Sequence, residues 1–64
     1  MRHTEFWQRM EQALGAAYAR SWASSVVLAD LDRRTAQQAI DEGVAPKQVW
    51  LAVWRQLELP DRDR

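Results

Sequence analysis

The sequence of 64 residues contains no cysteine, two glycines and a single histidine. Without cysteine the chain can form neither a disulfide framework nor a thiolate metal site, and so small a protein fits a reducing compartment better than secretion. We therefore expect a cytoplasmic protein. From its length we also expect a single domain, without a nucleotide-binding βαβ pair or a barrel, because each of these needs a longer chain.

Long apolar runs and an excess of one charge are also missing. The longest apolar run, Val26–Ala29, is far shorter than the roughly 20 residues that cross a bilayer. Glu5 interrupts the N-terminal segment before any signal-like apolar stretch. Nine basic and nine acidic side chains balance each other, which disfavours the broad basic surface that nucleic-acid binding usually requires. We expect no membrane segment.

The residue combinations that carry catalysis are absent as well. The sequence has no recognisable nucleophile with a base, no cluster of metal ligands and no glycine-rich phosphate loop. His3 lies near the N-terminus without neighbouring ligands. Asp30 and Asp32 adjoin Arg33 and Arg34, which is typical of a solvated loop. We therefore expect a non-enzymatic protein without a catalytic residue, metal or cofactor.

Aromatic side chains are the residues most able to fill a hydrophobic core in this sequence. Ordering a chain costs about 1.5 kcal/mol per residue, and the burial of apolar surface must offset this cost. Because alanines bury little area, we expect the aromatic side chains to fill the core rather than to stack on a ligand. They are Phe6, Trp7, Tyr18, Trp22, Trp50 and Trp54.

Helix signals divide the first half of the chain. Thr4 is the predicted N-cap of a first helix, and Gly15 is its predicted stop. Between residues 16 and 31 the apolar residues fall on two sides of a helix, which favours a break at Ser24-Ser25. The alternative is one helix that is covered on two sides. The inward face of the first helix is predicted to hold Phe6, Trp7, Met10, Ala13 and Leu14.

The second half carries sharper signals. Thr35 and Gln38 form a capping-box pattern that predicts a helix over 36–42, and Gly43 ends it. Pro46 opens the last helix, because proline at the first helical position loses no hydrogen bond. The apolar arc of this last helix contains Val49, Trp50, Val53, Trp54 and Leu57.

These signals together predict an all-α fold, a compact small bundle of four or five short helices. One helical domain is expected over residues 1–60, with Leu59-Pro60 as the final helix stop. Residues 61–64 alternate in charge and lack apolar anchors, so we expect a disordered charged tail.

The last two helices have the residue spacing of a helix-turn-helix. In that motif a small residue lets the helices approach, a glycine makes the turn, and apolar residues fill the angle between the helices. The matching positions are Thr35, Ala39, Gly43, Val44 and Val49. We expect a helix-turn-helix-like arrangement, and we favour simple packing of two helices over DNA binding as its explanation.

The last helix is more apolar than one buried stripe requires, and this surplus suggests a protein interface. Its predicted residues are Trp50, Leu51, Trp54, Lys47 and Arg55. The simpler alternative is that Trp54 covers the core and Leu51 is a lone exposed apolar residue. We expect another protein as the partner, and a monomer or weak homodimer.

A DNA-binding accessory protein is the second functional hypothesis. Its predicted nucleic-acid contacts are Arg33, Arg34, Lys47, Gln48 and Arg55. Such binding would weaken steeply with salt. The acidic residues Asp41 and Glu42 just before the turn would repel phosphate, so we rank this hypothesis below protein binding.

The order of residues along nearly the whole chain resembles an actinobacterial family of short proteins of unknown function. The matching positions include Thr4-Glu5-Phe6-Trp7, Gly15-Ala16-Ala17-Tyr18, Gln38-Ala39-Ile40, Glu42-Gly43-Val44, Pro46, Val49-Trp50 and Leu59-Pro60. The resemblance implies a single small helical domain without an assigned catalytic residue. It also implies genes near those for the recombinase RecA and its regulator RecX, and hence a setting in DNA repair or recombination.

Overall fold

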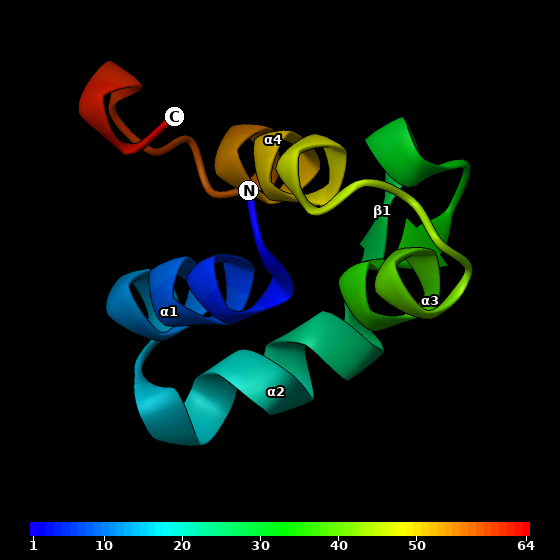
Figure 1. Cartoon of the computed structure of the whole chain (residues 1–64), viewed down its shortest axis with the longest axis horizontal. Helices are drawn as coiled ribbons and strands as arrows, with labels where there is room; N and C mark the ends of the chain where they lie inside the picture. Colours follow the sequence, from blue (N-terminus) through cyan, green and yellow to red (C-terminus); the bar gives the residue numbers. More distant parts are fainter.

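The computed structural model describes residues 1–64 and contains four α-helices, two short strands and two 3-10 turns (Figure 1). The predicted helical character is confirmed, but the fold is not strictly all-α, because the two strands form a small antiparallel sheet. In chain order the elements are α1 (His3–Leu14), α2 (Ala16–Ser25), β1 (Val27–Leu28), η1 (Ala29–Leu31), β2 (Arg34–Thr35), α3 (Ala36–Asp41), α4 (Pro46–Gln56) and η2 (Asp61–Asp63).

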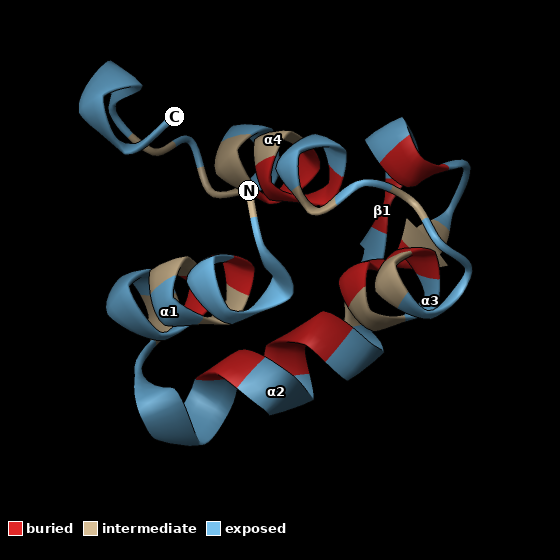
Figure 2. Ribbon diagram, viewed as in Figure 1, coloured by how far each residue is buried: buried red, intermediate tan, exposed pale blue.

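The four helices form a closed ring around one core. Helix α1 packs on α2, α2 on α3, and α3 on α4, and α4 returns to α1 (Figure 1). The small sheet lies against α2, α3 and α4. Figure 2 shows that the buried residues face the inside of this ring. The ring therefore gives α4 one buried side and leaves its other sides available for contacts.

The core contains fewer aromatic side chains than the sequence predicts. Tyr18 is 55% exposed, because it lies on the outer side of α2. Trp7 and Trp54 are half-buried at the edge of the core. The buried residues are Phe6, Met10, Ala19, Trp22, Ala23, Leu28, Leu31, Ala36, Ala39, Val49, Trp50, Ala52 and Val53. Small alanines thus let the helices approach closely, and three large aromatic rings fill the space between them.

Helix α1 begins earlier than predicted and ends as predicted. Its N-cap is Arg2 rather than Thr4, and no side chain caps the helix. Gly15 separates α1 from α2 with φ +89, a conformation that L side chains rarely adopt. The amide of Gly15 donates to the carbonyl of Glu11 at 2.7 Å. The predicted glycine stop is therefore confirmed, and Ala13, predicted to face inward, is exposed.

The predicted break at Ser24-Ser25 is confirmed, since α2 ends at Ser25. A small hairpin follows this helix. In the hairpin, Val27 pairs with Thr35 and Leu28 pairs with Arg34. Asp32 and Arg33 both have positive φ at the return of the chain. Branched residues favour extended backbone, but two-residue strands are too short to show an alternating pattern.

The capping box at α3 is present in both directions. The amide of Gln38 donates to Thr35 Oγ1 at 3.1 Å, and the amide of Thr35 donates to Gln38 Oε1 at 2.9 Å. Thr35 is also buried and belongs to β2. One side chain thereby joins the hairpin to the start of α3.

We expect Thr35→Ala to lower the free energy of unfolding by about 1 to 2 kcal/mol, because it leaves the partly buried amide of Gln38 without its acceptor. Thr35→Ser keeps the hydroxyl and should lose less than half of that amount. Urea unfolding followed by circular dichroism measures both variants. Equal losses for alanine and serine would show that the methyl group, rather than the cap, stabilises this junction.

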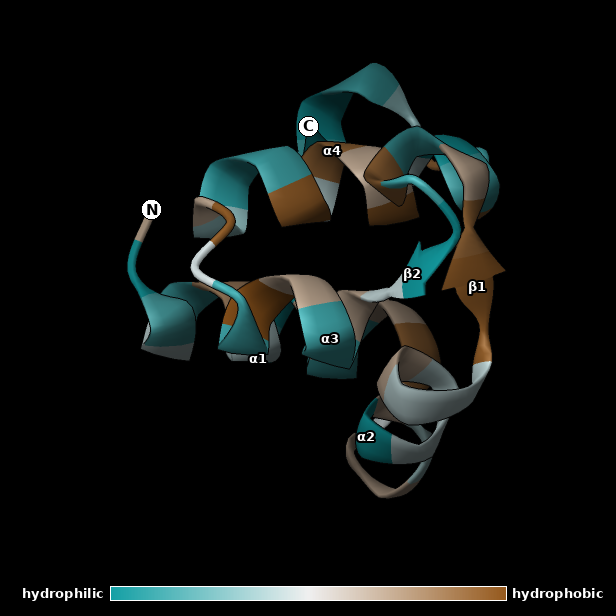
Figure 3. Ribbon diagram, turned by 90° about the vertical axis from the view of Figure 1, so that its right-hand side faces the viewer, coloured by the Kyte–Doolittle hydropathy of each residue, from teal (hydrophilic) through white to brown (hydrophobic).

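The C-terminal residues differ most from the sequence prediction. Residues 61–64 are predicted to be disordered, but Asp61–Asp63 form η2 and the segment lies against α4 (Figure 3). Helix α4 ends in a turn in which the amide of Leu59 donates to Trp54 O at 3.1 Å and the amide of Glu58 to Arg55 O at 3.2 Å. This turn directs the chain back over the helix. The segment is held there by hydrogen bonds from side chains of α4 to its own backbone. The side-chain composition of the segment does not reveal such bonds.

Candidate functional site

Helix α4 carries most of the predicted interface residues, and its orientation is set at both ends. A matching turn closes α3, with the amide of Val44 donating to Ala39 O at 3.0 Å and Gly43 at φ +91. Pro46 occupies the first turn of α4, as predicted. Val49 and Val53 are fully buried. These anchors fix which side chains of α4 reach the surface.

The structure divides the predicted protein interface into two parts. Lys47, Trp50 and Trp54 lie beside the C-terminal segment and donate hydrogen bonds to it. Leu51 and Arg55 instead line a surface hollow on the other side. Trp50 is only 2% exposed, so it supports the surface from beneath and offers little area of its own. The five predicted residues therefore do not form one continuous patch.

The hollow beside Leu51, which we call the Leu51 hollow, has a volume of about 400 Å³. It lies between α4, η1, β2 and the turn that precedes α4. Its apolar part comes from Leu31, Val44, Leu51 and Ala52. Its polar part comes from Asp30, Asp32, Arg34, Gln48 and Arg55. An apolar floor is thus surrounded by charges of both signs.

Ion pairs engage two of the predicted nucleic-acid cations. Arg34 Nη1 lies 2.6 Å from Glu42 Oε1, and Arg34 Nη2 lies 3.4 Å from Asp32 Oδ2. Arg34 Nε also donates to the carbonyl of Leu31 at 3.1 Å. Arg55 Nη1 lies 3.3 Å from Asp30 Oδ2. These pairs are exposed and individually weak, but they place carboxylates beside the guanidinium groups and so reduce the positive potential of this surface.

The remaining nucleic-acid candidates do not share one face. Arg33 is exposed at the hairpin return with no hydrogen bond from its side chain. Lys47 donates to the main-chain oxygen of Arg64 at 2.9 Å, on the side of the C-terminal segment. Gln48 lies at the Leu51 hollow. The structure therefore collects Arg34, Gln48 and Arg55 at one place and separates Lys47 from them.

Sequence reasoning missed some of the partners of these residues. The sequence predicts a loop network of Asp30 and Asp32 with Arg33 and Arg34. Asp32 does pair with Arg34, but the ion pair of Asp30 is with Arg55, 25 positions along the chain. Leu31 and Val44 are not among the predicted interface residues, although they form part of the floor. No local spacing indicates these contacts, because they depend on the hairpin that places η1 next to α4.

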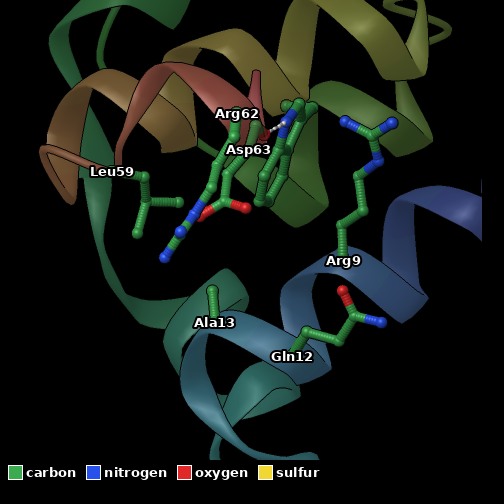
Figure 4. Close-up of a pocket in the computed structure, with 7 residues that line it drawn as sticks. Arg9, Gln12, Ala13, Leu59, Arg62 and Asp63 are labelled. Carbon is green, nitrogen blue, oxygen red and sulfur yellow. Dashed lines mark hydrogen bonds between the residues drawn. The ribbon is translucent and has the colours of Figure 1, made fainter.

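A second hollow, of about 340 Å³, lies between α1, α4 and the C-terminal segment (Figure 4). Arg9, Gln12 and Ala13 of α1 form one side of it. The opposite side is formed by Trp50, Leu59, Arg62 and Asp63. Figure 4 shows Arg62 extending along the hollow, whereas the Arg9 guanidinium points away from it.

Neither hollow brings together three or more histidine, cysteine, aspartate or glutamate side chains that could hold a metal ion, and no other part of the chain does so. His3 is exposed at the start of α1. The helices are all too short and too polar to cross a membrane.

A protein-family model described as "Protein of unknown function (DUF3046)" matches residues 1–62. No curated protein and no solved structure matches the chain.

Proposed function

This chain belongs to the DUF3046 family of proteins of unknown function, and we propose that it is a non-enzymatic cytoplasmic module that binds another protein at the Leu51 hollow. The observation that carries the proposal is the composition of this hollow. Its floor is apolar, and its rim holds Arg34, which pairs with Glu42, and the pair Arg55–Asp30. Protein interfaces have this arrangement, with an apolar centre that excludes water and a polar rim.

Leu51 is the residue on which binding depends most. It is half-buried in the floor, with Arg55 on the next turn of the helix. An apolar side chain from a partner that fills the hollow would cover Leu51 and remove it from water. The charges of both signs on the rim favour a partner whose own surface is mixed in charge, because a polyanion would meet the carboxylates of Asp30 and Asp32.

A DNA-binding accessory protein is the second proposal, favoured by the turn between α3 and α4. The residue spacing from Ala39 to Val49 and the left-handed Gly43 are the features expected of a helix-turn-helix. The setting in DNA repair or recombination rests on the gene neighbourhood that the family resemblance implies, and it belongs to the protein-binding proposal as well. The neutralised cations beside the hollow make it the weaker of the two.

Affinity capture from a native lysate with matched variants tests protein binding. Leu51→Asp places a charge in the apolar floor, and we expect it to lose every specific partner while the helical circular dichroism spectrum is unchanged. Gln56→Asp adds the same charge at an exposed position of α4 outside the hollow, and it should capture the same proteins as the wild type. A Leu51→Asp variant that still captures all of these proteins would exclude the hollow as the binding site.

A DNA-binding measurement on the wild type and on Arg55→Ala separates the two proposals. Fluorescence anisotropy with duplex and single-stranded DNA at low salt should show no binding by the wild type. Binding that falls steeply as salt is added, and that Arg55→Ala weakens, would support the DNA-binding accessory protein instead.

A further inference from the structure

The C-terminal segment, residues 59–64, is held by side chains of the helices that all donate hydrogen bonds to its main-chain oxygens. Trp54 Nε1 donates to Pro60 O at 2.9 Å, and Trp50 Nε1 donates to Asp63 O at 2.8 Å. The main-chain oxygen of Arg64 accepts from Arg9 Nη1 at 3.0 Å and from Lys47 Nζ at 2.9 Å. We call residues 59–64 the strap and these four donor side chains the strap site.

The side chains of the strap contribute little to this contact. Asp61, Arg62 and Asp63 are exposed, and no hydrogen bond or ion pair joins their side chains to the helices. Leu59 packs against the core, and the Arg64 guanidinium lies 5.1 Å from the centroid of the Trp54 ring. The strap site therefore binds the main chain of the strap and one leucine side chain, and the other side chains of the strap contribute little to binding.

Two features weaken the closed position of the strap. The hollow of about 340 Å³ beneath it shows that the strap does not pack tightly against α1 (Figure 4). Glu58, where the chain turns back, has φ +53, although a non-glycine residue in this region is strained. If the strap lifts, this residue is free to return to an ordinary conformation. The strap can then open while the ring of helices stays folded.

From these contacts we propose that the strap site is a peptide-binding site that the strap fills within the same chain. When the strap opens, the site binds a segment of a partner protein that has the same chemistry as the strap. That segment carries a leucine followed by proline and one helical turn, so that its carbonyls meet the strap site. The proposal goes beyond the Leu51 hollow, because it uses different side chains of α4. A partner must compete with the tethered strap, whose effective concentration is of millimolar order.

A labelled peptide of residues 57–64, Leu-Glu-Leu-Pro-Asp-Arg-Asp-Arg, provides the probe. Full-length Leu59→Asp, in which the strap loses its anchor, should bind the peptide at least tenfold more tightly than the wild type in fluorescence anisotropy. Adding Trp54→Phe to this variant removes the donor to Pro60 O and should weaken binding about tenfold. A peptide with both aspartates replaced by alanine should bind as well as the parent, whereas one with its second leucine replaced by aspartate should not bind.

Exchange of the indole protons tests opening in the unmodified chain. We expect the Nε1 protons of Trp50 and Trp54 to exchange at least tenfold faster than the backbone amide of Val53 in the core. Glu58→Gly relieves the strain of the closed turn and should slow the indole exchange relative to Val53.

Three results would overturn the proposal. In the first, folded Leu59→Asp does not bind the peptide. In the second, the indole protons exchange only as fast as the core amide, which means that the strap does not open by itself. In the third, the wild type forms a dimer that Glu58→Gly reduces, which identifies a second copy as the occupant. Failure of the Leu51→Asp experiment leaves all three measurements unaffected, so the two proposals fail separately.

Discussion

Trp50→Ala is expected to leave little folded protein at room temperature. Trp50 is 2% exposed and is the largest fully buried side chain. Its removal should cost about 3 to 5 kcal/mol, because the lost burial and the resulting cavity both destabilise the fold. A domain of this size has a total stability of only about 3 to 10 kcal/mol, so the variant loses much or all of its margin.

Trp50→Phe is the matched control for this prediction. It retains most of the apolar volume but removes the indole donor to Asp63 O. We expect a loss of about 1 to 2 kcal/mol, with the strap opened and the helices retained. Urea unfolding followed by circular dichroism measures both variants. If alanine costs no more than phenylalanine, Trp50 acts through the strap, and its contribution to the core is wrongly assigned.

The helix boundaries that local chemistry determines could be predicted from the sequence. The capping box at Thr35, the proline at Pro46 and the turns at Gly15 and Gly43 each depend on residues a few positions apart. Propensity and capping act over this same range. These boundaries also divide the chain into its successive helices. How the helices close into a ring depends on contacts between distant residues, which no local pattern contains.

The small sheet and the ordered strap could not be predicted from the sequence, and the reasons are physical. Strands of two residues cannot display alternation, and Asp32 and Arg33 are not residues that usually signal positive φ together. The strap has a charged and exposed composition, and its order comes from its carbonyls. Side-chain composition carries no information about backbone acceptors. A charged tail with two indoles on the preceding helix is the only sequence signal of this contact.

Only the residues that α4 contributes to the candidate site could be predicted from the sequence, and the geometry of the site could not. Leu51 and Arg55 lie together, as the helical spacing indicates. Their neighbours Asp30, Leu31 and Val44 come from other elements, and the hairpin determines their positions. Helical spacing predicts Trp54 beside Leu51 in one patch, yet the indole nitrogen of Trp54 donates to the strap. Helical periodicity places residues on α4, and tertiary contacts decide what each side of α4 meets.

Two adjacent aromatic residues of α1 provide the second large expected effect. Phe6 is fully buried, whereas Trp7 is half-buried at the edge of the core. Their rings meet edge to face, with centroids 5.1 Å apart. The outer face of Trp7 is covered by the guanidinium of Arg20, at 3.9 Å from the ring centroid. The two side chains are thus chemically similar and differ in environment.

We expect Phe6→Ala to cost about 3 to 5 kcal/mol and Trp7→Ala about 1 to 2 kcal/mol, although tryptophan is the larger residue. The buried ring leaves a cavity in the closed ring of helices, whereas the edge ring leaves a space that water can fill. Urea unfolding of both variants gives the two losses in the free energy of unfolding. Arg20→Ala measures how much of the Trp7→Ala loss comes from the cation–π contact, which we expect to be about 0.5 to 1 kcal/mol. If Trp7→Ala is the more destabilising change, the centre of the core lies beneath Trp7, and the arrangement of α1 in the ring is wrong.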